Sequence, residues 1–184
     1  MNPAPNLFLI GPMGAGKTSI GRHLARQLGL RFIDLDLELE ARIGASVALT
    51  FEIEGEAGFR KRESALLGEL VRQCGIVLAT GGGAVLDPAN RKLLREHGFV
   101  VWLDTDVDTQ LDRLHADRQR PLLQGADRHE RLLNMAKLRN PLYAQTADLR
   151  ISACGHGSSN FMARQVGEQI ADSWDYLKSE TSHD

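Results

Sequence analysis

Short apolar runs separated by longer amphipathic stretches dominate the hydrophobic pattern of the chain. Such runs lie at residues 7–10, 76–79 and 99–103, and two segments that include charged residues, 31–34 and 149–151, are also predicted to be short strands. Runs of this length without polar alternation are typical of strands buried on both faces, as in a parallel sheet. We therefore predict five strands.

The stretches between these runs have helical periodicity. Ile20, Leu24 and Leu28 recur every four residues, and Gly29 follows as a helix-ending residue. Further helices are expected at 35–43, 47–53, 56–74, from Pro88 onward, and at 106–114, 128–147 and 161–177. Alternating strands and helices favour an α/β fold of three layers, α/β/α, with a central five-stranded parallel sheet. The polar, Arg-rich stretch from 115 to 128 is expected to be a loop.

The glycine-rich segment after the first strand contains the main chemical signal. Gly11 is followed by four residues and then by Gly16, Lys17 and Thr18, which matches the phosphate-binding loop motif between a strand and a helix. Such a loop directs backbone N–H groups and the positive end of a helix at phosphate. A dinucleotide motif would need glycine where Ser19 stands. The expected contacts to nucleoside triphosphate come from Gly14, Ala15, Gly16, Lys17, Thr18 and Ser19.

The phosphate loop does not by itself identify the acceptor or the metal-binding carboxylate. No NKxD segment is present, which disfavours a GTPase. Asp34 and Asp36 end the second strand, where a carboxylate can hold Mg²⁺ through water, accept a hydroxyl proton or cap the next helix. Asp104, after the apolar run 99–103, is an equally good candidate on physical grounds.

A second glycine cluster and four arginines are further candidates. Residues 81–83 are three glycines after the third strand, where bare backbone permits close approach of a ligand. Arg118 and Arg120 lie in the irregular segment and could close over a triphosphate. Arg60 and Arg139 have no assigned role from pattern alone.

Composition limits the remaining function classes. A chain of 184 residues is expected to form one domain, and its net charge of −2 gives no electrostatic support for nucleic-acid binding. The apolar runs are too short for a membrane span or a signal peptide, so we expect a cytoplasmic protein. Cys74 and Cys154 form no metal-binding pair, and both are expected to be buried free thiols.

Taken together, these motifs resemble the shikimate kinase family over nearly the whole chain. The resemblance rests on segments 11–22, 32–36, 54–60, 79–83, 120–123 and 139–143. It implies a P-loop kinase domain spanning 1–184, with a substrate-binding segment at about 34–62 and a lid at about 113–126. It also implies transfer of a phosphoryl group from ATP, with Mg²⁺, to the 3-hydroxyl of shikimate, by a monomer that binds no nucleic acid or membrane.

The resemblance assigns roles to individual residues. It favours Asp36 over Asp104 as the residue that contacts the substrate hydroxyl, and it matches Asp34 and Thr18 to the Mg²⁺ site, Asp34 acting through water. The implied catalytic residues are Lys17, Asp36 and Arg120, of which Arg120 also contacts ATP. The implied shikimate contacts come from Asp36, Arg60, Gly81, Gly82 and Arg139. Segment 153–160 does not align clearly, so no adenine contact is assigned. Gluconate kinase and a non-catalytic nucleotide-gated module are the competing hypotheses.

Overall fold

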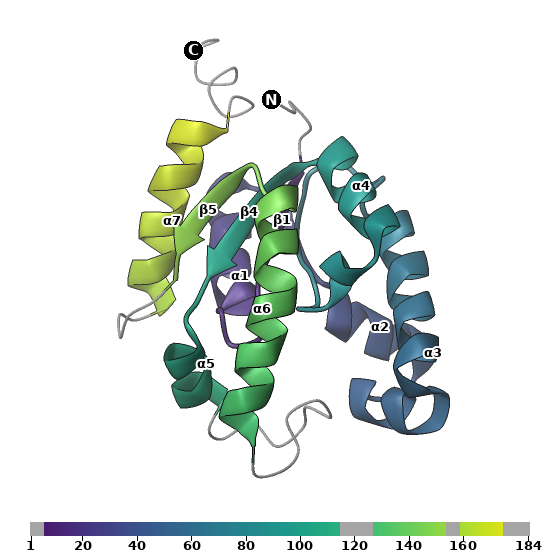
Figure 1. Ribbon diagram of the computed structural model, residues 1–184. Helices are drawn as coiled ribbons and strands as arrows, with labels where there is room; N and C mark the ends of the chain where they lie inside the picture. The colour runs from purple at the N-terminus through teal and green to yellow at the C-terminus, as the bar shows by residue number, and fades with distance from the viewer. Residues whose placement is uncertain (1–5, 115–126, 154–158, 175–184) are drawn as a thin grey trace.

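The computed structural model (Figure 1) describes residues 6–114, 127–153 and 159–174 and contains one five-stranded sheet. The strand order is β2-β3-β1-β4-β5, and every neighbouring pair is parallel. The strand bounds are β1 Leu7–Ile10, β2 Arg31–Asp34, β3 Ile76–Ala79, β4 Phe99–Asp104 and β5 Leu149–Ser152. The predicted parallel sheet and its five strands are confirmed.

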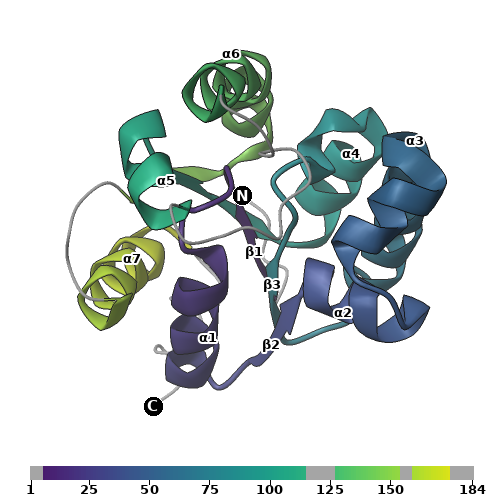
Figure 2. The same ribbon diagram turned by 90° about the horizontal axis from the view of Figure 1, so that it is seen from below.

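Helices cover both faces of this sheet, which confirms the three-layer arrangement (Figures 1 and 2). α1 and α7 pack on one face, whereas α2, α3, α4 and α6 pack on the other. Their bounds are α1 Lys17–Leu28, α2 Leu35–Ile43, α3 Val47–Leu70, α4 Pro88–His97, α5 Val107–Leu114, α6 Arg128–Thr146 and α7 Ser159–Ser173, with a short 3-10 helix η1 at Ala84–Leu86.

The alternation of side chains along the strands divides the interior into two cores. In β1, Leu7 and Leu9 join the core beneath α1 and α7, whereas Phe8 and Ile10 join the core beneath α3, α4 and α6. All four side chains are fully buried. A strand with apolar residues at every position is therefore explained by helices on both of its sides.

Asn6 connects the amino-terminal ends of three strands, on the side of the sheet opposite the phosphate loop. Its amide nitrogen lies 2.6 Å from the Gln73 carbonyl oxygen and 3.1 Å from that of His97, and its Oδ1 accepts the Ile76 N–H at 3.2 Å. The Asn6 carbonyl accepts the Phe99 N–H at 2.9 Å. A single buried side chain thus fixes where β1, β3 and β4 begin.

Two expectations from the sequence need correction. The helices expected at 47–53 and 56–74 are joined in α3, which has a kink at Gly55 (φ 69°, ψ 179°) and ends at Leu70. The early end leaves Cys74 in a turn, where it is exposed, so the prediction of a buried thiol is wrong for Cys74. Cys154 lies outside the described residues.

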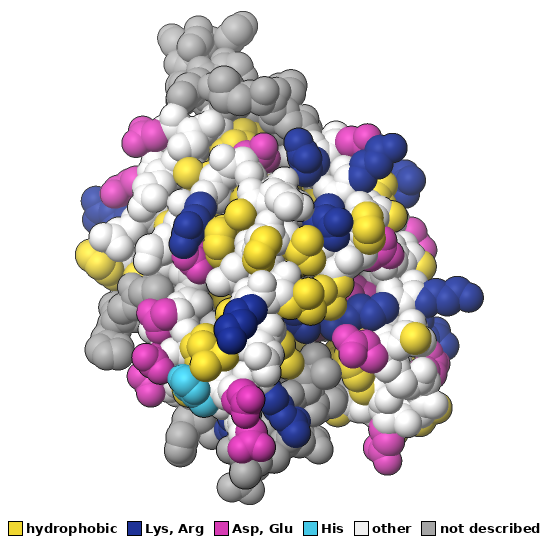
Figure 3. Space-filling view, in the orientation of Figure 1, with side chains coloured by type: hydrophobic (Ala, Val, Ile, Leu, Met, Phe, Trp, Pro, Cys, Tyr) yellow, Lys and Arg dark blue, Asp and Glu magenta, His cyan; other side chains and the backbone are white. Residues whose placement is uncertain are grey.

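The face covered by α6 and α4 carries acidic and basic side chains interspersed with hydrophobic ones (Figure 3). This mixture agrees with the small net charge of the chain. Among the helices that the structure describes, none is long and apolar enough to cross a membrane.

Candidate active site

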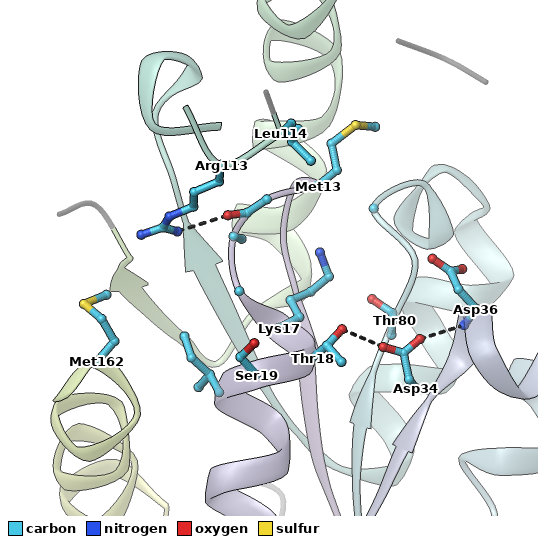
Figure 4. A pocket seen from close by; sticks show the side chains of 15 residues that line it. Met13, Lys17, Thr18, Ser19, Asp34, Asp36, Thr80, Arg113, Leu114 and Met162 are labelled. Atoms are coloured by element: carbon cyan, nitrogen blue, oxygen red, sulfur yellow. Dashed lines mark hydrogen bonds between the residues drawn. The ribbon is translucent and has the colours of Figure 1, made fainter. Parts of the chain in front are cut away.

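A cavity of about 390 Å³ opens at the carboxyl ends of the strands, next to the phosphate loop. It is lined by Met13, Gly14, Ala15, Gly16, Lys17, Thr18, Ser19, Ile20, Asp34, Asp36, Thr80, Gly82, Arg113, Leu114 and Met162. Figure 4 shows that the labelled side chains of this set come from the loop and α1, from the ends of β2 and β3, and from α2, α5 and α7. The structure therefore brings most of the residues expected to contact nucleotide to one cavity.

The loop backbone has a shape that requires glycine. Gly11, Gly14 and Gly16 all have positive φ angles, a region that other residues rarely adopt. At Gly11 the close approach adds a second reason, because a Cβ atom there would come 2.5 Å from the Leu103 carbonyl oxygen. The Lys17 ammonium group donates to the carbonyls of Gly11 and Pro12 at 2.8 and 2.7 Å. These two contacts hold the charge of Lys17 at the phosphate loop.

Asp34 caps α2, as one of the sequence alternatives predicted, and it also contacts the phosphate loop. Its Oδ1 caps α2 by accepting the N–H groups of Asp36 and Leu37 at 3.1 and 3.3 Å. Its Oδ2 accepts the Thr18 hydroxyl at 2.6 Å (Figure 4). The cap therefore orients the carboxylate whose other oxygen contacts the phosphate loop.

The rival aspartate is engaged elsewhere. Asp104 Oδ2 accepts from Nε and Nη2 of Arg150 at 3.0 and 2.5 Å, and the guanidinium also lies over the Trp102 ring, 4.6 Å from its centroid. Asp104 does not line the cavity, whereas Asp34 and Asp36 do. The geometry therefore favours the second strand as the source of the functional carboxylates.

The second glycine cluster lies between these carboxylates and the arginines. A Cβ atom on Gly81 would come 2.5 Å from Oε1 of Glu63 and 3.0 Å from Oδ1 of Asp36. A Cβ atom on Gly83 would come within 2.6 Å of Nη1 of Arg60 and closer still to Nη2 and Cζ. Bare backbone is thus what allows the charged side chains to approach this turn.

Glu63 is a site residue that sequence reasoning missed. It is 0% exposed, and its Oε2 accepts from Nη1 of Arg60 at 2.7 Å. Burial raises the pKa of the Glu63 carboxyl, an effect that Arg60 partly opposes and nearby Asp36 reinforces. A usable signal existed in the sequence, because Glu63 lies on the same helical face as Phe59, four residues before it, and Leu66, three residues after it.

Arg139 contacts the same glycine turn from α6. It is buried, and its Nη1 lies 3.4 Å from the carbonyl oxygen of Gly82. Both predicted shikimate-binding arginines therefore lie at this turn, Arg60 beside Gly83 and Arg139 beside Gly82. Neither of them lines the cavity beside the phosphate loop itself.

Arg113 is a second residue that sequence reasoning did not single out. Its guanidinium donates to the Gly14 carbonyl at 3.0 Å and to the Ala153 carbonyl at 2.9 Å, and it borders the cavity (Figure 4). Two anchors on separate segments fix this cation beside the phosphate loop. Arg118 and Arg120, the arginines that the sequence predicted to lie over the triphosphate, fall outside the described residues.

Comparisons with known proteins identify the family of the chain. The family model described as shikimate kinase matches residues 13–172. The chain is 51% identical to the shikimate kinase of Halorhodospira halophila over 89% of this chain and 92% of that protein. Among solved structures, the chain is similar to shikimate kinase from Acinetobacter baumannii in complex with shikimate, with 44% identity and a TM-score of 0.88 over 92% of this chain and 94% of that one. It is also similar to shikimate kinase from Aquifex aeolicus, with 28% identity and a TM-score of 0.74 over 97% and 99%.

Proposed function

The chain belongs to the shikimate kinase family, and we propose that it transfers the γ-phosphoryl group of ATP to the 3-hydroxyl of shikimate, yielding shikimate 3-phosphate and ADP. The observation that carries this proposal is the shared cavity, in which Asp36 faces the same space as the phosphate loop. A hydroxyl held by Asp36 would lie on the side of the cavity toward which the loop presents a terminal phosphate.

The phosphate loop would bind the triphosphate through backbone N–H groups and through Lys17. Phosphate oxygens would replace the carbonyls of Gly11 and Pro12 that Lys17 now contacts. Oxygen donors are also the ligands that Mg²⁺ prefers, and the hydroxyl of Thr18 with the carboxylate of Asp34, 2.6 Å apart, offers such a pair. We therefore propose that Thr18 ligates Mg²⁺ directly and that Asp34 acts through a water. When bound, Mg²⁺ would neutralise charge on the β- and γ-phosphates.

Asp36 would orient the acceptor. Its carboxylate would accept the proton of the 3-hydroxyl while that oxygen attacks the γ-phosphorus and the bond to the β,γ-bridging oxygen breaks. Arg60 and Arg139 would bind the shikimate carboxylate, because a planar guanidinium matches a carboxylate in a two-point contact. Gly81 and Gly82 would contact the substrate through their backbone.

The proposal extends to the parts of the chain around this centre. Residues 34–62 would form the substrate-binding segment, and residues 113–126 a lid in which Arg120 offsets developing negative charge and water is excluded. We also propose that the protein is active as a monomer. An ATP-consuming step of this kind fits a cytoplasmic location.

The direct test is ADP formation with purified protein and MgATP. We expect shikimate to stimulate ADP release by orders of magnitude over the rate without acceptor, with the phosphate on the 3-oxygen by ³¹P NMR. Gluconate at the same concentration should leave the basal rate unchanged. Equal stimulation by gluconate, or slow turnover that no hydroxy acid stimulates, would contradict the proposal.

A matched pair of substitutions tests the assignment of the aspartate. Asp36→Asn should lower kcat by at least about a hundredfold while ATP still binds, because the hydroxyl loses its proton acceptor. Asp104→Asn removes the same charge from Asp104, which pairs with Arg150. This variant should retain near-normal kcat. Normal turnover by the Asp36 variant would rule out its proposed role.

A further inference from the structure

The carbonyl of Gly82 is the point at which α6 contacts the glycine turn. The Tyr143 hydroxyl donates to this oxygen at 2.5 Å, and Arg139, four residues earlier on α6, reaches it at 3.4 Å. The ring of Tyr143 packs against that of Trp102, with the two ring centroids 5.7 Å apart. Tyr143 is 1% exposed. A rigidly packed side chain therefore supplies the shorter of the two hydrogen bonds to this carbonyl.

The Tyr143 hydrogen bond also sets the direction of the neighbouring peptide group. The Gly82 carbonyl and the Gly83 N–H belong to one planar trans peptide, so these two groups point in opposite directions. Fixing the carbonyl toward α6 thus turns the Gly83 N–H away from α6. Since Gly82 and Gly83 carry no side chains that could restrict rotation of this plane, an external contact has to do so.

The same hydrogen bond affects Arg139. The carbonyl of Gly82, which is partly buried, has a second donor within reach, the guanidinium of Arg139. Because Tyr143 already satisfies the oxygen, the guanidinium does not have to turn further toward Gly82. Nε of Arg139 is buried and has no hydrogen-bond partner among the described residues, so the guanidinium still has capacity to bind an anion.

The hydroxyl of Tyr143 remains a donor under ordinary conditions. Burial raises the pKa of Tyr143 well above its usual value of 10.0, although Arg139 opposes the shift. The phenol therefore stays protonated through the neutral range, and its hydrogen is available to Gly82.

We infer that Tyr143 is a positioning residue for the acceptor site, which holds the Gly82–Gly83 peptide and leaves Arg139 free to bind the shikimate carboxylate. This inference rests on the proposed function. It assigns Tyr143 no contact with the substrate, because the hydroxyl acts through Gly82 and Arg139.

Tyr143→Phe tests the inference, because it removes the hydroxyl and keeps the packed ring. The Gly82 carbonyl would then recruit Arg139, and we expect the KM for shikimate to rise about tenfold while kcat and the KM for ATP change less than twofold. In the Arg139→Ala background the same substitution should raise the shikimate KM by a smaller factor than in the wild-type background, because the part of the effect that passes through Arg139 is already lost.

Thr146→Val is the matched control. Thr146 is also buried on α6, and its hydroxyl donates to the Leu142 carbonyl at 2.6 Å rather than to the glycine turn. It should lower the melting temperature without raising the shikimate KM.

Three results would overturn the role of Tyr143. They are an unchanged shikimate KM in Tyr143→Phe, equal increases in the KM for shikimate and for ATP, and a Tyr143→Phe protein that does not fold, since the hydroxyl would then serve the fold rather than the site. The proposed function fails separately, if the wild-type protein shows no shikimate-dependent ADP release.

Discussion

Gly83→Ala should disable acceptor binding through a single added methyl group. Gly83 has φ −101° and ψ −2°, a conformation that alanine adopts readily, so backbone strain does not contribute. The new Cβ atom would instead come within 2.6 Å of Nη1 of Arg60, and nearer to Nη2 and Cζ. Ordinary contacts lie near 3.5 Å, so the guanidinium has to move by about 1 Å or more.

The size of the effect follows from what that guanidinium does. Its ion pair with Glu63 is 2.7 Å long, and a shift of this size breaks the present geometry. A charge-assisted hydrogen bond contributes about 1.5–3 kcal/mol. Losing the Arg60 contact to the shikimate carboxylate should therefore raise the shikimate KM roughly tenfold to a hundredfold. The KM for ATP should change less than twofold, because Arg60 does not line the cavity at the phosphate loop.

Steady-state kinetics with each substrate varied in turn would measure this separation. Gly68→Ala is the matched control, because Gly68 is buried in the last turn of α3 and its added Cβ would meet Nη1 of Arg72 at an ordinary 3.6 Å. That variant should have unchanged KM values and equal or higher stability. An unchanged shikimate KM in Gly83→Ala, or equal increases for both substrates, would refute the reasoning.

Three further predictions concern the fold, the buried carboxylate and the nucleotide. Asn6→Leu removes the buried amide contacts at the beginnings of three strands. It should lower the free energy of unfolding by about 3–5 kcal/mol and the melting temperature by roughly 8–15 °C. A shift of the melting temperature below about 3 °C in calorimetry would contradict this. The raised pKa of Glu63 means that the folded state binds its proton more tightly than the unfolded chain does, so this group lowers stability as pH rises from its ordinary value of 4.5 through the raised value. The melting temperature of Glu63→Gln relative to wild type should accordingly be higher at pH 8 than at pH 5, and an equal difference at both pH values would argue against the shift. Arg113→Ala removes a cation anchored beside the loop and should raise the KM for ATP about tenfold with the shikimate KM unchanged, whereas equal changes in both would point to general loosening.

The sequence predicts the fold well because the three inner strands are buried on both faces. This holds for β1, β3 and β4, whose apolar runs mark the strands almost independently of tertiary contacts. The two outer strands, β2 and β5, are only partly buried and include charged residues. The length of α3 was the exception, because no residue in the predicted segment 56–74 marks its early end at Leu70. Cys74 was misplaced for the same reason.

The site was less predictable, since its geometry depends on contacts between distant segments. The sequence pattern could not rank the two aspartate candidates, because it does not contain the strand order or the contacts between strands. In the sheet, β4 lies next to the loop strand β1, whereas β2 is separated from β1 by β3. What distinguishes Asp104 from Asp34 is a partner, Arg150, on another strand. The hydroxyl of Tyr143 likewise acquires its role only when α6 packs beside Gly82.

The position of β1 in the sheet has a consequence for synthesis of the chain. β1 is made first but occupies the centre, and its residue Leu7 pairs with Val77 on one side and Phe99 on the other. The ribosome therefore has to deliver about a hundred residues before the second neighbour of β1 exists, and contacts so distant in sequence slow folding. Until β4 is made, one side of β1 has no partner strand, and other nascent chains can pair with it there. Chaperone dependence should accordingly be greatest for nascent chains that end before β4.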